Sequence, residues 1–320
     1  MKHLIFYKKN KPIIAIPMNG GLKISLVSVS CLPSHTLIRK IFKIYMYFKV
    51  LIAYIGFVQY SAVEGILRTW FYSLEISTDK LYPVFIWSLV EGRERYYVHL
   101  INEDGVKSYF VKITLKSEDY LLLENEKNKL QYFTNAKNFD VPSVISFVKN
   151  NSYCALITSY LDSSYTLYHP EDNIFPISLF KEISGNIQKV AISQLKILDK
   201  KEDNNNLWVF INRINKNNLV LVSNVHGDFG SENIFKNNKN MFYIIDWERS
   251  ETIAPYLTDE IGYWLGKHHL LIKNNSDDIY KKFRYHFRKY NSIDIALGLL
   301  FLINVNFDLA ILMSKSWKDK

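Results

Sequence analysis

The sequence predicts an α+β protein with two lobes, a small lobe built on an antiparallel sheet and a larger lobe that is mainly helical. Short runs rich in β-branched and aromatic residues, separated by polar turns, occupy residues 84–160. From residue 179 onward, apolar residues recur instead at helical spacing. The 320 residues suffice for two lobes and an N-terminal extension, which we place at 1–80, 81–161 and 162–320.

Composition narrows the class of protein. A hydrophobic content of 48%, with 15% aromatic residues, excludes general disorder. The two cysteines, Cys31 and Cys154, are isolated in sequence, so neither a disulfide framework nor a zinc site is expected. The net charge of +9 comes with lysines spread over the chain and no recognisable nucleic-acid module. We therefore expect no nucleic-acid partner and a cytoplasmic protein with reduced thiols.

The N-terminal extension predicts a β-hairpin, a further strand and a helix. Leu4–Tyr7 and Pro12–Pro17 flank a polar turn, and the run Lys23–Cys31 alternates enough to be a strand. A helix is expected from Ser34, which would cap it. Its apolar residues share one face: Leu37, Ile41, Ile44, Tyr45, Phe48, Ile52 and Ile55.

This apolar helix has two interpretations besides a transmembrane span. A span over Ile41–Tyr60 is disfavoured because Lys43 and Lys49 would lie inside the bilayer. Packing of the helix against the first lobe is the expected arrangement. Peripheral contact with the inner membrane surface through residues 34–58 is the alternative, because basic amphipathic helices bind such surfaces.

Three antiparallel strands are predicted in the first lobe, at Val84–Leu89, Tyr96–Ile101 and Ser108–Thr114, with N-E-D-G as the turn between the last two. Two more follow at Val144–Phe147 and Tyr153–Tyr160. Between these groups, helical spacing extends over residues 117–133, with Ser117 at the start, and includes Glu126, Leu130 and Phe133.

The second lobe is expected to contain a long buried helix at Leu179–Asp199, and a short helix or strand at Leu207–Ile211. Three further helices are predicted near the C-terminus. They cover Ile261–Leu271, Ile279–Tyr290 and Ile293–Met313.

One stretch of the second lobe carries most of the chemical information. Residues 225–235 read V-H-G-D-F-G-S-E-N-I-F, and after six mostly polar residues F-Y-I-I-D-W-E follows. Asp228, Asn233 and Asp246 therefore stand in fixed register, and the strand-like run Met241–Ile245 delivers the last carboxylate. One carboxylate to orient and deprotonate a hydroxyl, with two oxygen ligands for Mg²⁺, is the set that phosphoryl transfer from a nucleotide requires.

These motifs resemble the aminoglycoside phosphotransferase and choline kinase group of small-molecule kinases, which share the protein-kinase-like fold. Asp228 and Asn233 have the D-x-x-x-x-N spacing of a kinase catalytic loop, with H-G-D in place of H-R-D and I-D-W-E in place of D-F-G. The resemblance covers residues 84–310 and implies transfer of a phosphoryl group from ATP to a hydroxyl of a small molecule or sugar. It implies that Asp228 acts on the hydroxyl and that Asn233 and Asp246 hold Mg²⁺.

The same resemblance assigns supporting roles. His226 would hold the catalytic loop through backbone hydrogen bonds, and Asp259 would cap a helix and brace the loop. Lys112, on the opposite face of its strand from Val111 and Ile113, would contact the phosphates and pair with Glu126. Lys116 and Glu124 are the competing candidates for that pair. The interlobe hinge, whose backbone binds adenine, falls near Ser159, Tyr160 and Leu161.

The phosphate loop departs from the kinase pattern. Residues 88–95, S-L-V-E-G-R-E-R, contain one glycine in place of G-x-G-x-x-G, so Ser88 and Gly92 are the candidate phosphate contacts, with Arg93 as a third. The chain has no Walker A sequence, which excludes the P-loop class.

The acceptor and the oligomeric state stay open at this stage. The basic segment Tyr280–Tyr290 is the reverse of what a polycationic aminoglycoside requires, so an antibiotic acceptor is not expected. Two other functions remain: a pseudokinase that binds nucleotide without turnover, and a membrane-associated kinase of a lipid-linked or surface-polysaccharide sugar.

Overall fold

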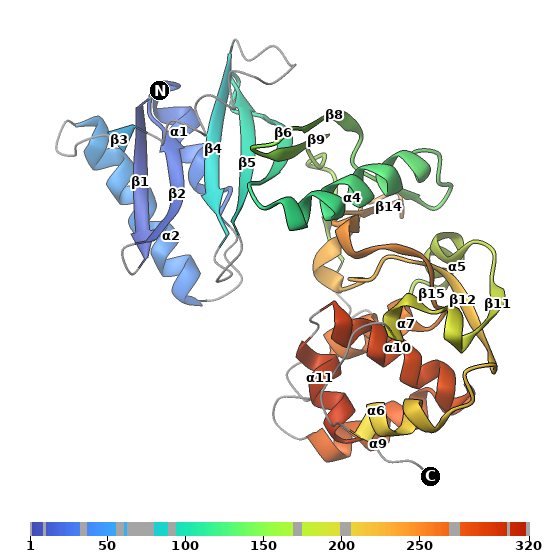
Figure 1. Cartoon of the computed structure of the whole chain (residues 1–320). Coiled ribbons are helices and arrows are strands. Elements are labelled where there is room, and N and C mark those ends of the chain that lie inside the picture. The colour runs from blue at the N-terminus through green and yellow to red at the C-terminus, as the bar shows by residue number, and fades with distance from the viewer. Residues whose placement is uncertain are drawn as a thin grey trace. The chain divides into compact units, whose positions relative to one another are not determined.

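The computed structural model describes residues 2–8, 11–32, 37–55, 61–62, 80–88, 94–168, 175–198, 206–268, 276–305 and 308–317. The chain forms two compact units (Figure 1). Unit 1 comprises Met1–Lys127 and Pro142–Leu161, and unit 2 comprises Asn128–Val141 and Asp162–Lys320.

Unit 1 is built on an eight-stranded antiparallel sheet with the order β3-β1-β2-β4-β5-β6-β9-β8. The strands are β1 (Lys2–Lys8), β2 (Lys11–Pro17), β3 (Ser61–Ala62), β4 (Leu81–Trp87), β5 (Arg95–Asn102), β6 (Lys107–Thr114), β8 (Val144–Lys149) and β9 (Cys154–Ser159). The five strands predicted for the first lobe and the N-terminal hairpin are therefore confirmed.

The turn between β5 and β6 shows why these strands pair as predicted. The Asn102 side chain accepts a hydrogen bond from the Val106 N–H at 2.8 Å, and Gly105 adopts a φ of 80° that favours glycine. The turn joins β5 to β6, and in this strand pair Val98 lies opposite Val111 and Tyr97 lies opposite Lys112. Alternation along β6 therefore separates Lys112 from its apolar neighbours.

The N-terminal hairpin belongs to the same sheet and is not a separate domain. Strand β2 pairs with β4 in the registers Ile14–Ile86 and Ala15–Phe85. A hydrophobic cluster joins buried side chains of the hairpin, such as Ile14, to Val84 of β4. The extension and the first-lobe strands therefore share a core.

The strand predicted at Lys23–Cys31 is wrong, because helix α1 (Gly21–Val29) occupies this segment. Ile24, Ser25, Ser28 and Val29 are buried, a spacing that fits a helix and not a strand. Ser25 and Ser28 satisfy their hydroxyl groups by donating to carbonyls of Pro17 and Ile24, at 2.6 and 2.7 Å. Packing of α1 on β2 thus outweighs the β propensity of this segment.

Helix α2 (Leu37–Tyr54) forms where predicted, but a different face of it is buried from the apolar face that the spacing indicated. Met46, Val50 and Ala53 are fully buried against α1 and β1, whereas Ile41, Ile44 and Phe48 are exposed. The predicted cap, Ser34, lies outside the described residues. Among the helices that the structure describes, none is long and apolar enough to cross a bilayer.

Helix α4 (Tyr120–Tyr132) follows a short 3₁₀ turn, η1 (Ser117–Asp119), as the helical spacing of 117–133 predicts. Its buried side chains include Leu123, Glu126 and Leu130. The division between the units falls within this helix, after Lys127.

Two small sheets position the loops of unit 2. One has the order β10-β13-β14-β7 and the other β11-β12-β15. Their strands are β7 (Phe139–Asp140), β10 (Thr166–Leu167), β11 (Gln188–Ala191), β12 (Leu219–Val225), β13 (Ile234–Lys236), β14 (Phe242–Ile244) and β15 (Glu251–Pro255). Each of the sequence motifs of residues 225–248 begins at the end of one of these strands.

Helices supply most of the core of unit 2. They are α5 (Ile177–Ser184), α6 (Asn206–Arg213), α7 (Thr258–Lys267), α9 (Ser276–His286), α10 (Ser292–Asn304) and α11 (Asp308–Lys315). Helix α10 buries nine consecutive residues from Ile295 to Ile303, and α7 packs against it. Within the described residues, the predicted helices at 261–271, 279–290 and 293–313 are confirmed, the last of them as α10 and α11. Residues 269–271 and 306–307 of these predictions lie outside the described residues.

The long helix predicted at Leu179–Asp199 is wrong. Helix α5 ends at Ser184 because Gly185 adopts a φ of 56°, and β11 follows and pairs with β12. The short element at Leu207–Ile211 is the helix α6. The α+β class, with an antiparallel sheet first and a largely helical part after it, is as predicted.

Ile14 tests the contribution of the N-terminal hairpin to unit 1, because it is fully buried and pairs with β4. We expect Ile14→Ala to lower the free energy of unfolding by about 2–5 kcal/mol. The melting temperature should fall by roughly 2–4 °C for each kcal/mol lost. Leu121→Ala, at a position 69% exposed, is the control and should change it little. Equal melting temperatures for the two variants would contradict a shared core.

Candidate active site

The H-G-D motif forms the loop that follows strand β12. This strand is the centre of its sheet, pairing with β11 through Val222 and Gln188 and with β15 through Val225 and Glu251. The apolar residues Val220, Val222 and Val225 are buried, and a register shift between Ser223 and Val225 turns the last of them inward. The loop therefore leaves a rigid support.

His226 is fully buried and uses both ring nitrogens within the loop. Its Nε2 lies 2.9 Å from the Ile245 carbonyl, which can only accept, so Nε2 carries the proton. Nδ1 then accepts from the N–H of Asp228 at 3.3 Å. The imidazole thus joins the H-G-D loop to the end of β14, which is the structural role predicted for it.

Asp259, in the first turn of α7, binds the backbone of the same loop. One carboxylate oxygen accepts from the N–H of His226 at 2.7 Å and the other from the N–H of Gly227 at 2.9 Å. Complete burial raises the pKa of Asp259 to about 7, and these two N–H groups act in the opposite direction. The predicted brace is therefore present as a two-point contact.

Asp228 is the carboxylate that this framework presents. Its side chain keeps 20% of its accessible surface, and Arg249 Nη1 lies 3.5 Å from its Oδ2. Burial raises the pKa of Asp228 to about 6, the Arg249 guanidinium lowers it, and the carboxylates of Asp246, Glu232 and Glu248 raise it further. The result is a carboxylate that is ionised at neutral pH and more basic than an ordinary aspartate.

Asn233 and Asp246 are brought to this carboxylate by the hairpin of β13 and β14. The hairpin pairs Ile234 with Ile244, and the N–H of Ile245 donates to the Asn233 carbonyl at 3.1 Å. The Asn233 amide donates from Nδ2 to the backbone carbonyl of Asp228 at 2.8 Å. Its Oδ1 therefore points away from that carbonyl and offers an oxygen ligand.

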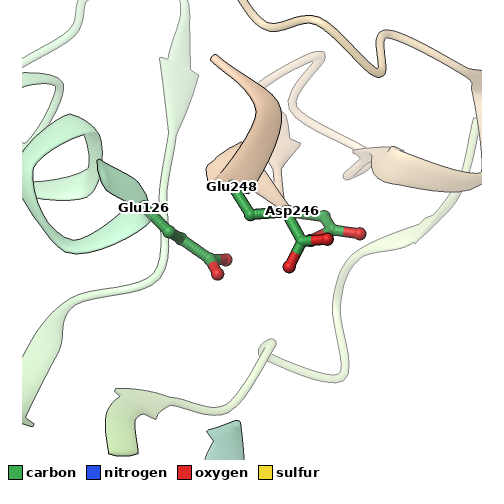
Figure 2. Close-up of side chains that lie close together, drawn as sticks. All are labelled: Glu126, Asp246 and Glu248. Atoms are coloured by element: carbon green, nitrogen blue, oxygen red, sulfur yellow. The ribbon is translucent and has the colours of Figure 1, made fainter. Parts of the chain in front are cut away.

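Asp246 stands at the end of β14 in the left-handed backbone region, with a φ of 67°. Aspartate and asparagine adopt this conformation more readily than most residues. Two residues later Glu248 leaves the same turn, η6 (Trp247–Arg249), and Figure 2 shows both side chains. Carboxylate oxygens of Asp246 and Glu248 lie within 4.8 Å of each other.

The chemistry of these donors fits a magnesium ion. Mg²⁺ prefers oxygen ligands and is commonly held by one or two carboxylates together with phosphate oxygens. Asn233 Oδ1 and the Asp246 carboxylate are the predicted ligands, and Glu248 is a further carboxylate that the sequence prediction did not include. Glu248 is buried. The sequence signal that could have identified it is its position in the I-D-W-E motif, two residues after Asp246.

In unit 1, Lys112 and Glu126 form a buried ion pair. Lys112 Nζ lies 2.9 Å from both carboxylate oxygens of Glu126. The Glu126 side chain, which belongs to α4, is drawn in Figure 2. The competing candidate Glu124 instead binds Lys149 at 2.8 Å at the surface. Lys116 stands before η1 and is not in this pair. Of the alternatives left open by the sequence, the geometry therefore selects Lys112 and Glu126.

The structure describes some of the other predicted nucleotide contacts, but not all of them. The Ser88 N–H donates to the Arg95 carbonyl at 2.9 Å, closing the end of the β4–β5 hairpin, whereas Gly92 and Arg93 lie outside the described residues. At the hinge, the N–H groups of Ser159 and Tyr160 donate to other backbone carbonyls of unit 1. Adenine contacts of these two residues would therefore use their carbonyls, with Leu161 next in the chain.

Three residues outside the predicted set hold unit 2's loops together. Trp247 is fully buried, with its ring centroid 4.5 Å from that of His226. Arg249 binds Asp228, as described above. Lys129, in the last turn of α4, donates from Nζ to Asn224 Oδ1 at 3.1 Å and Thr252 Oγ1 at 3.2 Å, and burial lowers its pKa. Spacing alone did not predict Lys129, because its partners are about a hundred residues away.

A basic pocket of about 570 Å³ also lies in unit 2. It is lined by residues of α7 and α9 and of the segments that follow them: Trp264, His268, Lys281, Lys282, Tyr285, His286 and Arg288. The His268 and Trp264 rings stack with centroids 4.0 Å apart. Burial and neighbouring cations lower the pKa of His268 and His286, so the permanent positive charge comes from the lysines and the arginine. The lining does not include Asp228, Asn233 or Asp246.

Gly227 tests the geometry of the H-G-D loop. It has a φ of 81°, and a Cβ there would collide with the Arg249 backbone carbonyl. We expect Gly227→Ala to lower the free energy of unfolding by more than about 2 kcal/mol, because the alanine would combine a strained φ angle with a steric clash. Gly266→Ala in α7 is the matched control, because a Cβ there meets nothing within 4 Å. Thermal unfolding of the two variants provides the comparison, and an unaffected Gly227→Ala protein would contradict this loop geometry.

Comparison with known proteins found matches among solved structures. No protein-family model and no curated protein matches the sequence. Among solved structures, the chain is similar to macrolide 2'-phosphotransferase type I, with a TM-score of 0.46 and 15% identity over 81% of this chain and 100% of that one. It is also similar to aminoglycoside phosphotransferase APH(3'')-Id from Streptomyces rimosus, with a TM-score of 0.44 and 11% identity over 80% and 100%.

A third similar structure is the GDP complex of an aminoglycoside 2'-phosphotransferase mutant, with a TM-score of 0.41 and 15% identity over 77% of this chain and 88% of that one. At these scores, the function of this chain has to be argued from its own residues.

Proposed function

We propose that this protein is an ATP-dependent phosphotransferase that moves the γ-phosphoryl group to a hydroxyl of a small molecule or sugar. The observation that carries the proposal is the hydrogen-bonded framework of unit 2. It holds the carboxylate of Asp228 near that of Asp246, which raises its pKa, and it ties the Asn233 amide to the Asp228 backbone carbonyl. Phosphoryl transfer needs few covalent roles from the protein, and these three groups supply them.

Asp228 is the catalytic residue in this proposal. Its carboxylate orients the acceptor hydroxyl and takes the proton as the hydroxyl oxygen bonds to the γ-phosphorus, while the bond from that phosphorus to the β-phosphate oxygen breaks and ADP leaves. A pKa of about 6 leaves Asp228 ionised at neutral pH and still able to accept a proton. The bound Arg249 keeps that pKa from rising further.

Asn233 and Asp246 are the proposed magnesium ligands, with Glu248 close enough to take part through an oxygen of its own. When bound, Mg²⁺ would neutralise negative charge on the nucleotide phosphates. The chain's part is to fix the ligands, which it does by tying Asn233 to Asp228 and by holding Asp246 at the end of β14.

Lys112 is proposed to contact the α- and β-phosphates, oriented by Glu126. The pair is buried, so its ammonium is held in one place by two contacts of 2.9 Å. Ser88 and Gly92 are proposed as further phosphate contacts, and the backbone near Ser159, Tyr160 and Leu161 as the adenine contact. His226 is a positioning residue, because both of its nitrogens already hold the loop.

The acceptor is proposed to be neutral or anionic. Unit 2, which carries the proposed catalytic residue, also carries the basic pocket with Lys281, Lys282 and Arg288, and this charge would repel a polycationic aminoglycoside. The aromatic and imidazole rings of the pocket suit the apolar face of a sugar. A panel of hydroxyl compounds should therefore separate by charge, with neutral or phosphate- and carboxylate-bearing sugars above aminoglycosides.

Substitution of the two aspartates tests the proposal, because their proposed roles differ. We expect Asp228→Ala to reduce ATP consumption with the acceptor panel by at least a hundredfold, since general-base catalysis contributes about that much or more. The melting shift induced by Mg²⁺ and ATP should remain. Asp246→Asn, which keeps the left-handed backbone, should instead abolish that shift. In the wild-type protein the shift reflects a stabilisation of about 2.7 kcal/mol at a nucleotide concentration of 100 times the Kd.

Asp104→Ala, in the exposed turn before Gly105, is the control and should change neither measurement. An active Asp228→Ala enzyme would refute the catalytic assignment. A nucleotide-induced melting shift without consumption of ATP or GTP, across the whole panel, would show a nucleotide-binding module without turnover.

The dependence of the rate on pH tests the pairing of Arg249 with Asp228. As the pH falls through about 6, Asp228 gains a proton and can no longer accept one, so kcat should decline on the acid side. Arg249 lowers that pKa, so Arg249→Gln should move the acid limb to higher pH. Arg213→Gln, an exposed arginine of α6, makes the same change of charge and should leave the limb in place. An acid limb that is unchanged in Arg249→Gln is the contrary result.

A further inference from the structure

The net positive charge of the chain is concentrated near its N-terminus, because acidic residues are absent there. Cationic residues are spread along the sequence as expected, but acidic ones are not: the first 63 residues contain eight lysines, one arginine and no aspartate or glutamate. Their formal charge of +9 equals that of the whole chain, with its 40 basic and 31 acidic residues. Residues 64–320 therefore contain 31 of each sign, and the first 63 residues carry all of the net charge.

Helix α2 of this extension exposes a continuous apolar stripe. The core side of the helix is formed by Met46, Val50 and Ala53, which are fully buried. Along the opposite side, residues spaced by three or four positions remain exposed to solvent by 43% or more: Ile38, Ile41, Ile44, Phe48, Leu51 and, just past the last turn, Ile55. At 100° per residue these side chains fall on one face, directed away from the core.

Cationic side chains border this stripe. With Phe48 at its centre, Lys40 lies on one side of the helix and Lys49 on the other, and Lys49 Nζ is 5.7 Å from the centroid of the Tyr45 ring. Lys43 reaches back to the carbonyls of Ser30 and Leu32 at 3.4 and 3.3 Å. An apolar stripe bordered by lysines, on a helix without acidic residues, is the pattern of helices that lie in a bilayer interface.

We propose that α2 is an interfacial helix that docks unit 1 on an anionic lipid surface. The stripe enters the boundary between headgroups and acyl chains, and the lysines contact the lipid phosphates. The charge of the first 63 residues favours this occupant over a second copy of the chain, because dimerisation through this face would bring together two segments of formal charge +9 each. This proposal does not depend on phosphotransfer.

Vesicle binding of the full chain tests the proposal. We expect the protein to sediment with vesicles containing phosphatidylglycerol and to remain largely in solution with pure phosphatidylcholine. Binding should weaken as salt rises. The double variant Ile41→Glu, Phe48→Glu should lose at least tenfold in partition coefficient, and its melting temperature should not change because both positions are exposed.

A charge-matched control separates the stripe from the overall charge. Val106→Glu, Leu121→Glu changes two exposed apolar residues of unit 1 outside α2 by the same two charges, and should retain most of the binding. Lys40→Ala and Lys49→Ala should each reduce binding to anionic vesicles by about fivefold, without effect on phosphatidylcholine.

Three results would overturn the proposal. The wild-type protein could fail to bind anionic vesicles at low salt, or the stripe variant could bind as well as its charge-matched control. The third is a dimer of the wild-type protein in solution that becomes a monomer in the stripe variant, without vesicle binding by either. That outcome would assign the stripe to self-association.

Discussion

The carboxylate of Asp259 is the constraint on which the arrangement of unit 2 depends. Where the H-G-D loop leaves strand β12, its backbone N–H groups have no strand partner, and two buried donors of this kind cost several kcal/mol if they lack an acceptor. Asp259 accepts both, from His226 and Gly227, and it comes from the first turn of a helix that packs into the core. The loop is thus fastened to the most buried part of the unit by one side chain.

The remaining contacts of the site extend this fastening outward. His226 connects the loop to the end of β14, and Asn233 connects the hairpin of β13 and β14 back to Asp228. His226 uses both of its ring nitrogens in these contacts. Asn233 uses only its amide nitrogen, which donates to the Asp228 carbonyl, and its Oδ1 is directed elsewhere. In unit 1, the carboxylate of Glu126 fixes the ammonium of Lys112.

Sequence predicted the parts of the protein whose signals are local. The strands of the first lobe alternate and are joined by turns with asparagine and glycine, and the site residues are fixed by spacing within two short motifs. Segments that failed had local patterns at odds with their packing: Lys23–Cys31 looks like a strand but folds as α1 on β2, and Gly185 divides a stretch with helical spacing. Lys129 and Arg249 acquire their partners only in three dimensions. For α2, spacing identified an apolar face correctly but could not say that a second face, with Met46 and Val50, is the one buried.

The pairing of β2 with β4 has a mechanical consequence for anything that binds the N-terminal extension. The pairing of β2 with β4 and the buried cluster around Ile14 join the extension firmly to the rest of the sheet. A flexible linker would instead let the extension rotate independently of that sheet. A ligand seated on α2 would therefore set the angle at which the whole eight-stranded sheet meets that ligand. On a lipid surface, the protein would then diffuse in two dimensions and keep one preferred orientation. It would therefore encounter an acceptor embedded in that surface far more often than one dissolved in the surrounding solution.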